Sequence, residues 1–102
     1  MNKYEIRFAL ANISNKIKLK LLQMYNNEEN IYNNINEIFK SDMMSLKDKV
    51  KFKEHSYEDE MNFLKALNDN SIEIVKITEK HYPEKLRNID NPPYILFYKG
   101  KL

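Results

Sequence analysis

Residues 81–102 read HYPEKLRNIDNPPYILFYKGKL, and this stretch decides how the second half of the chain folds. Its apolar run, Tyr94 to Tyr98, follows a rigid proline pair and is closed by Gly100, the only glycine in the chain. A short apolar run between such turn residues is typical of a buried strand. Nothing follows this strand to cover it, so either a second copy pairs with it or the natural protein continues beyond Leu102. We expect that it continues.

A second strand is predicted over Ile72 to Ile77, where β-branched residues dominate and apolar and charged residues alternate at first. Sixteen residues separate Ile77 from Tyr94, which is too long a connection for a tight hairpin. The connection includes Pro83 to Arg87, a segment that can form one helical turn with proline at its first position. We therefore expect a parallel crossover between the two strands.

Residues 1–70 show helical periodicity instead. The first two predicted helices are residues 3–11 and Ser14 to about Tyr25, and the third runs from Asn27 onward through Ile31, Ile35 and Ile38. A fourth helix follows Ser41-Asp42, with Met43, Leu46 and Val50 facing inward. The fifth runs from Ser56 to Asp69, with Tyr57, Met61, Leu64 and Leu67 facing inward. Helices joined by turns this short pack on one another. The predicted fold is mainly α, with a small helical bundle over residues 1–70 and the opening strands of an α/β domain, truncated at its end, over residues 71–102.

Composition sets modest limits on function. The chain has 17 Lys+Arg against 15 Asp+Glu, a net charge of +2, whereas a nucleic-acid binder that works through bulk charge is usually more basic. The absence of cysteine excludes disulfides, thiol nucleophiles and thiolate metal sites. No stretch resembles a signal peptide or approaches the ~20 apolar residues that span a bilayer. We expect a soluble cytoplasmic protein without membrane contact.

No residue pattern predicts catalysis or metal binding. Glu58, Asp59 and Glu60 stand at the start of a predicted helix, where the macrodipole favours acids, so we assign them a structural role. His55 and His81 are lone histidines, and we assign neither to a metal site. The serines stand at turns or caps, without the Gly-x-Ser-x-Gly elbow of a hydrolase. We therefore expect no enzyme, no cofactor and no bound metal.

Lys16, Lys18 and Lys20 are the candidate nucleic-acid contacts, because no acid interrupts the stretch from Ser14 to Gln23 and lysines bind phosphates. At two-residue spacing on a helix, Lys16 and Lys20 share a face while Lys18 does not. A solvated helix surface is the alternative interpretation. The same two interpretations apply to the lysines at positions 47, 49, 51 and 53.

Residues 68–102 resemble the segment of the DprA/Smf DNA-processing family that leads into its Rossmann-like domain. The family has a strand, a Tyr-Pro-x-x-Leu element, a Pro-Pro pair, an apolar strand and a glycine, in this order. The corresponding signature residues here, after the strand at residues 72–77, are Tyr82, Pro83, Leu86, Pro92, Pro93, Leu96 and Gly100. The resemblance implies a structural role for these residues and a Rossmann-like domain around the second strand.

The helical part is similar to the N-terminal domain of the same family, which is related to SAM or helix-hairpin-helix folds. Leu21-Leu22 and Tyr25 stand where the family has a Leu-Leu pair and an aromatic residue. The hairpin that usually reads Gly-Ile-Gly is Asn12-Ile13-Ser14 here. Glycines in such hairpins expose backbone N–H groups to phosphates, whereas a residue with a Cβ restricts the turn and crowds the approach. We therefore expect that this hairpin does not grip DNA.

The resemblance implies a protein that binds single-stranded DNA, protects it and helps to load the recombinase RecA during natural transformation. It also implies a DNA pocket in the Rossmann-like domain, behind a Gly-rich loop that would follow Leu102. The leading hypothesis is the N-terminal part of a DprA-type protein, in which these residues are mainly a structural and protein-interaction module. The alternative is a free-standing helical adaptor or regulator. The codons after Leu102 distinguish the two, since the first requires a Gly-rich strand-turn-helix and the second a stop codon.

The strand at Tyr94 to Tyr98 also predicts self-association. Without neighbouring strands it would present unpaired backbone and aromatic side chains, an edge that proteins normally cover. We expect a strand-paired homodimer through this region, unless the strand folds back onto Ile72 to Ile77 within one chain.

Overall fold

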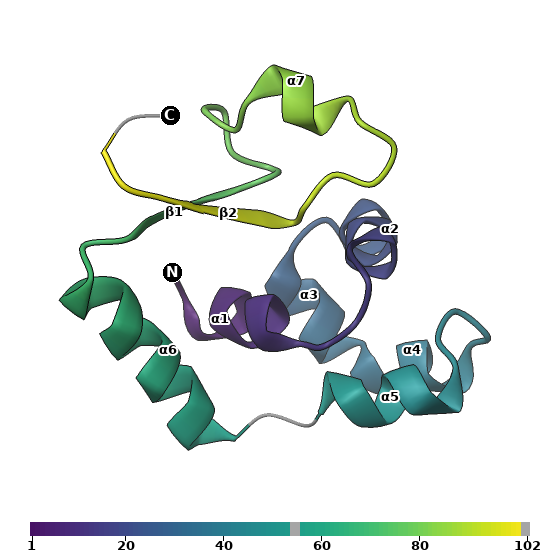
Figure 1. The fold of residues 1–102 in the computed structure, drawn as a ribbon. Coiled ribbons are helices and arrows are strands. Elements are labelled where there is room, and N and C mark those ends of the chain that lie inside the picture. The colour runs from purple at the N-terminus through teal and green to yellow at the C-terminus, as the bar shows by residue number, and fades with distance from the viewer. Residues whose placement is uncertain (54–55, 101–102) are drawn as a thin grey trace. The chain divides into compact units, whose positions relative to one another are not determined.

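The structure, a computed structural model, describes residues 1–53 and 56–100 and forms two compact units, Met1–Ser56 and Tyr57–Leu102 (Figure 1). His55 and Leu102 lie outside the described residues. The described part of the chain is mainly helical with one small two-stranded sheet, which confirms the mainly α class. The division falls before the last long helix rather than after it, so this helix shares a unit with the strands.

Polar caps determine where the helices of the first unit begin. The helices are α1 (Lys3–Leu10), α2 (Asn15–Tyr25), α3 (Glu28–Asn33), α4 (Ile35–Lys40) and α5 (Leu46–Phe52). Ser14 Oγ accepts a hydrogen bond from the backbone N–H of Ile17 at 3.2 Å, and Asn27 Oδ1 accepts one from Asn30 at 2.8 Å. These bonds satisfy N–H groups that the first helical turn leaves without an intrahelical partner. The caps predicted at Ser14 and Asn27 are confirmed.

The third predicted helix is divided at Asn34 into α3 and α4. Asn34 has φ −111° and ψ 20°, outside the α-helical region. Its side-chain Nδ2 donates to the carbonyl of Asn30 at 2.8 Å, a local bond by which asparagine competes with continued helix formation. Ile31 and Ile38 are nevertheless buried on either side of the break. The predicted apolar positions therefore hold, although the helix is not continuous.

The fourth predicted helix begins later than expected and turns a different face inward. Ser41 does not cap it, because its Oγ donates to the carbonyl of Ile38 at 2.6 Å and completes the end of α4. The cap is Ser45, and α5 starts directly after it. Leu46 and Val50, predicted to face inward, are both largely exposed. The predicted inner face is therefore wrong.

Phe52, at the end of α5, is the buried apolar residue of this helix, in place of the predicted Leu46 and Val50. Its ring centroid lies 6.4 Å from Phe8, 5.4 Å from Tyr32 and 5.9 Å from Phe39. Tilted and edge-to-face ring pairs at these distances contribute beyond the apolar area that they bury. The side chain of Phe52 is only 2% exposed, so this ring joins α1, α3, α4 and α5 into one core.

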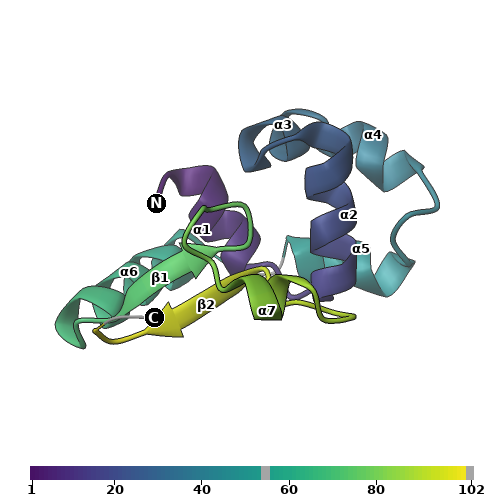
Figure 2. The same cartoon turned by 90° about the horizontal axis from the view of Figure 1, so that it is seen from above.

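The second unit contains α6 (Tyr57–Asp69), β1 (Glu73–Lys76), α7 (Glu84–Arg87) and β2 (Ile95–Tyr98). The strands pair antiparallel, with Glu73 opposite Tyr98 and Lys76 opposite Ile95 (Figure 2). The predicted parallel crossover is therefore wrong. The chain turns back directly after β1, where the N–H of Glu79 donates to the carbonyl of Lys76 at 2.9 Å. A parallel connection usually carries a full helix across the sheet, and α7 is a single turn.

The long helix α6 ends at Asp69, as predicted, but its predicted apolar stripe is only partly covered. Tyr57 and Met61 are exposed, and the later positions of the stripe are half-buried. The clearest contact with the sheet comes instead from Phe63, whose ring lies edge-to-face against Phe97 with the centroids 6.0 Å apart. This pair places α6 on the face of the sheet that carries Phe97.

Replacing Phe52 with alanine should lower the free energy of unfolding by about 3–5 kcal/mol, because it removes the central ring of the aromatic core and leaves a cavity. The measurement is urea unfolding of the whole chain, followed by circular dichroism. Val50→Ala is the matched control on the same helix, and its cost should be within about 0.5 kcal/mol because Val50 is 65% exposed. A larger cost for Val50→Ala than for Phe52→Ala would contradict this assignment.

Candidate functional site

The Tyr-Pro-x-x-Leu element and the proline pair meet in the loop between β1 and β2. Tyr82 Oη donates a hydrogen bond to the carbonyl of Pro93 at 2.7 Å, and the tyrosine side chain is only 2% exposed. Prolines have no backbone N–H, so this segment cannot extend the strand ladder in the usual way. Its carbonyl still requires a donor, and the tyrosine hydroxyl supplies one. The bond closes the loop and fixes the chain at the entry to β2.

Arg87 holds the same loop at a second place. Its Nη2 donates to the carbonyl of Glu79 at 2.8 Å, and its guanidinium lies 5.5 Å from the centroid of the Tyr82 ring. A planar guanidinium suits such stacking combined with hydrogen bonding. The ion pair of Arg87 with Glu84, at 2.9 Å, is largely exposed and contributes little by itself. Sequence reasoning did not single out Arg87, although it directly follows the leucine of the motif.

The other signature residues shape the loop and carry no reactive group. Pro83 is the residue before α7, not the first residue of the helix as predicted. Pro92 is buried, while Leu86 and Leu96 are half-buried. Gly100 has φ +79°, in the left-handed region that favours glycine. All of these positions serve the path of the chain around the two strands.

The hydroxyl of Tyr82 stays protonated around neutral pH. Burial raises the pKa of the phenol, and the positive charge of Arg87 acts in the opposite direction with a smaller effect. A protonated hydroxyl can donate, so the bond to the carbonyl of Pro93 persists over the physiological range.

The three lysines of α2 lie in two different environments. Lys16 and Lys20 are exposed. Lys18 is only 6% exposed, its Nζ donates to the carbonyl of Ala9 at 3.2 Å, and the amine lies 5.8 Å from the centroid of the Phe8 ring. The amine of Lys18 is thus engaged inside the first unit, and of the predicted phosphate contacts only Lys16 and Lys20 stand at the surface.

The burial of Lys18 had a signal in the sequence that the prediction missed. Lys18 stands three and four residues before Leu21 and Leu22, so it shares the helix face of these two buried leucines. Desolvation lowers the pKa of its amine from 10.5 to about 8. At neutral pH the amine is still mostly charged, and its burial then opposes folding.

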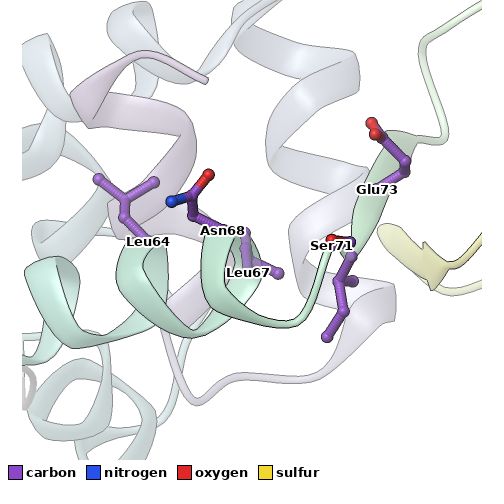
Figure 3. Close-up of a pocket in the computed structure, with 6 residues that line it drawn as sticks. Leu64, Leu67, Asn68, Ser71 and Glu73 are labelled. Carbon is purple, nitrogen blue, oxygen red and sulfur yellow. The ribbon is translucent and has the colours of Figure 1, made fainter.

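A pocket of about 410 Å³ lies where α6 ends and β1 begins (Figure 3). It is lined by Leu64, Leu67, Asn68, Ser71, Ile72 and Glu73. A second depression of about 290 Å³ shares Ile72 and is completed by Phe97, Tyr98 and Lys99. Glu73 is the one carboxylate among these lining residues, and it is exposed. The second depression is lined by two further titratable side chains, Tyr98 and Lys99.

The predicted acidic run lies in the first turn of α6, where Glu58 and Asp59 are exposed and Glu60 is buried. Within residues 1–53 and 56–100, no three side chains of the His, Cys, Asp or Glu type come close enough to hold a metal ion. In the same ranges, no helix combines the length and the apolar character needed to cross a bilayer.

Comparisons with protein-family models, with curated proteins and with solved structures found no match for this chain. Function is therefore inferred from the residues and their geometry. The geometry offers a tightly braced loop before β2, two exposed lysines on α2 and a shallow pair of pockets beside the sheet.

Tyr82→Phe should lower the free energy of unfolding by about 1–2 kcal/mol, because it removes one hydroxyl and leaves the carbonyl of Pro93 without that donor. Urea unfolding monitored by circular dichroism measures the loss. Tyr57→Phe makes the same chemical change at a side chain that is 73% exposed and should have almost no effect. Equal effects of the two variants would show that the bond to Pro93 does not brace the loop.

Lys18 should make stability rise with pH between about 8 and 10.5. In this window the unfolded chain, in which the pKa is 10.5, binds more protons than the folded chain, in which it is about 8, so the free energy of unfolding increases with pH. From pH 7 to pH 10, the free energy of unfolding of the wild-type chain should rise by up to about 3 kcal/mol relative to that of Lys18→Met.

The comparison requires urea unfolding of both proteins at each pH, so that groups common to both cancel. Lys16→Met is the control, since Lys16 lies on the same helix and is exposed. This control reports what the loss of a solvent-exposed lysine does to stability at each pH. A pH dependence for Lys18→Met no larger than that for Lys16→Met would show that the amine of Lys18 is solvated in the folded chain.

Proposed function

We propose that these residues belong to a cytoplasmic DNA-processing protein of the DprA type, which binds single-stranded DNA and assists a RecA-type recombinase in natural transformation. The observation that carries this proposal is the hydrogen bond from Tyr82 to the carbonyl of Pro93. It joins the two motifs on which the family resemblance depends, so their order and spacing along the chain have a physical reason.

The antiparallel pairing of β1 with β2 is compatible with a Rossmann-like domain. Many doubly wound sheets are parallel in the middle and carry an antiparallel strand at one edge. The two strands would then form the edge of a larger sheet, whose remaining strands follow Leu102. For the first unit we keep the SAM or helix-hairpin-helix relationship as part of the same proposal.

Within such a protein, the described residues act as a structural and protein-interaction module rather than as the DNA reader. The N–H of Ile13, in the hairpin between α1 and α2, donates to the carbonyl of Ala11 at 2.9 Å and is not presented to a phosphate. The amine of Lys18 is likewise engaged with Ala9. A net charge of +2 adds little electrostatic attraction for DNA.

A free-standing helical adaptor is the second candidate, and the exposed apolar side chains of α6 favour it. Tyr57 and Met61 lie on the predicted inner stripe of this helix and are exposed. An adaptor would cover such side chains with its partner. The coding sequence after Leu102 separates the candidates, because only the DNA-processing protein requires a Gly-rich strand-turn-helix there.

The chain should bind single-stranded DNA weakly and lose this binding at physiological salt. The reason is that only exposed lysines such as Lys16 and Lys20 are available for phosphates, and such contacts are screened by salt. The measurement is the fluorescence anisotropy of a labelled oligonucleotide titrated with the chain at low and at physiological salt. A double variant, Lys16→Gln with Lys20→Gln, should weaken the low-salt binding further.

Tight binding that survives physiological salt would contradict the assignment of these residues to a non-reading module. If the double variant kept this tight binding, the DNA contact would lie away from α2. If the double variant abolished it, α2 would itself be a DNA-binding helix.

A further inference from the structure

The outer edge of β2 presents backbone groups that the sheet does not use. The N–H of Ile77 donates to the carbonyl of Tyr94 at 2.9 Å, just beyond the paired strands. In an antiparallel ladder, hydrogen-bonded pairs alternate with non-hydrogen-bonded pairs. With Val75 opposite Leu96, the N–H and C=O groups of Leu96 therefore point toward β1. Those of Ile95 and Phe97 point away from it.

The two edges of this sheet are treated differently. By the same alternation, the N–H of Lys76 points to the outer side of β1, and it donates there to Glu79 Oε1 at 2.8 Å. This side chain blocks the approach of another strand to β1. On β2, the part of the chain that the structure describes provides no such cover for Ile95 and Phe97, and the Phe97 side chain is 52% exposed. Among the described residues, β1 is thus covered at Lys76, although not at Ile74, and β2 is the more open edge of the two.

We propose that a second copy of this chain pairs with this edge, antiparallel and about a two-fold axis at Leu96. The strand sequence from Tyr94 to Tyr98, YILFY, is almost a palindrome about Leu96. In this register Leu96 lies opposite Leu96 of the second copy, and Ile95 lies opposite Phe97 in both directions. The outward backbone groups of Ile95 and Phe97 then exchange N–H···O bonds with each other.

The uncharged, nearly palindromic strand and the small size of the sheet favour a second copy as the occupant. The strand from Tyr94 to Tyr98 carries no charged residue, and in this register Lys99 of one copy lies opposite Pro93 of the other. Like charges do not meet in this arrangement. A sheet of two short strands is marginal alone, and pairing makes it a sheet of four strands.

The two-fold symmetry also keeps each face of the sheet on the same side in both copies. A two-fold axis perpendicular to the sheet keeps both faces, so the face that carries Phe97 and Phe63 continues from one copy to the other. Both α6 helices then lie on the same side of a four-stranded sheet. This inference concerns the chain by itself and does not depend on the proposed function.

The test uses the absence of cysteine in the natural sequence. Leu96→Cys places one thiol at the two-fold axis, in a non-hydrogen-bonded pair whose geometry suits a disulfide. Phe97→Cys places one thiol at a more exposed position that lies two residues out of register with its own copy, beyond the reach of a disulfide. On mild oxidation, Leu96→Cys should form covalent dimers and Phe97→Cys should form far fewer.

Light scattering of the wild-type chain over a wide concentration range provides the second measurement, and the mass should rise from 12.3 kDa toward twice that value. Phe97→Pro removes an N–H that the β1 pairing does not use, so it should prevent the rise while circular dichroism still reports a folded chain. Ile89→Lys, at an exposed apolar residue outside the strand, should dimerise normally.

A monomer at every concentration would overturn the proposal. If Phe97→Cys formed more covalent dimer than Leu96→Cys, crosslinking would follow the exposure of the thiol, and this result would overturn the register and the two-fold axis at Leu96. Weak DNA binding together with a monomer would leave the proposed function intact while rejecting the dimer, so the two proposals fail separately.

Discussion

The hydrogen bond from the Tyr82 hydroxyl to the carbonyl of Pro93 is the constraint on which the second unit depends. A proline pair supplies stiffness but no donor, so the segment before β2 cannot hold itself in place through backbone bonds. The buried phenol of Tyr82 supplies the missing contact from the other half of the loop, and the guanidinium of Arg87 binds the carbonyl of Glu79 within that half. With its entry fixed, β2 pairs with β1 so that Val75 lies opposite Leu96, and this register determines both faces and both edges of the sheet.

The first unit depends on a different kind of constraint, which is the packing of aromatic rings. Phe52 touches rings from three other helices. The core therefore tolerates a break at Asn34 and a late start of α5, because ring contacts depend on position in space rather than on helix continuity. It also tolerates Lys18, whose buried amine finds an acceptor at Ala9.

Sequence reasoning succeeded where a single local interaction decides the outcome. The caps at Ser14 and Asn27 and the end of α6 at Asp69 each depend on a few neighbouring residues. It failed where distant residues compete. The inner face of α5 follows from rings far away in the chain, and the strand direction follows from a turn at Glu79 whose bonds have no strong sequence signature. The candidate lysines illustrate a success and a failure. Helical spacing correctly placed Lys18 on another face of the helix than Lys16 and Lys20, but the prediction did not recognise that Lys18 is buried.

The unequal edges of the sheet link its architecture to its possible assemblies. Glu79 covers the N–H of Lys76 on the outer side of β1, so β2 is the more open edge, and a strand added there would meet the apolar sequence around Leu96. A following strand of the same chain and a strand of a second copy compete for this one place. In a longer protein with a Rossmann-like sheet, the internal strand has the advantage of effective concentration, since it is covalently attached. The proposed self-pairing would use the open β2 edge, and the same backbone groups would serve the larger sheet when one is present.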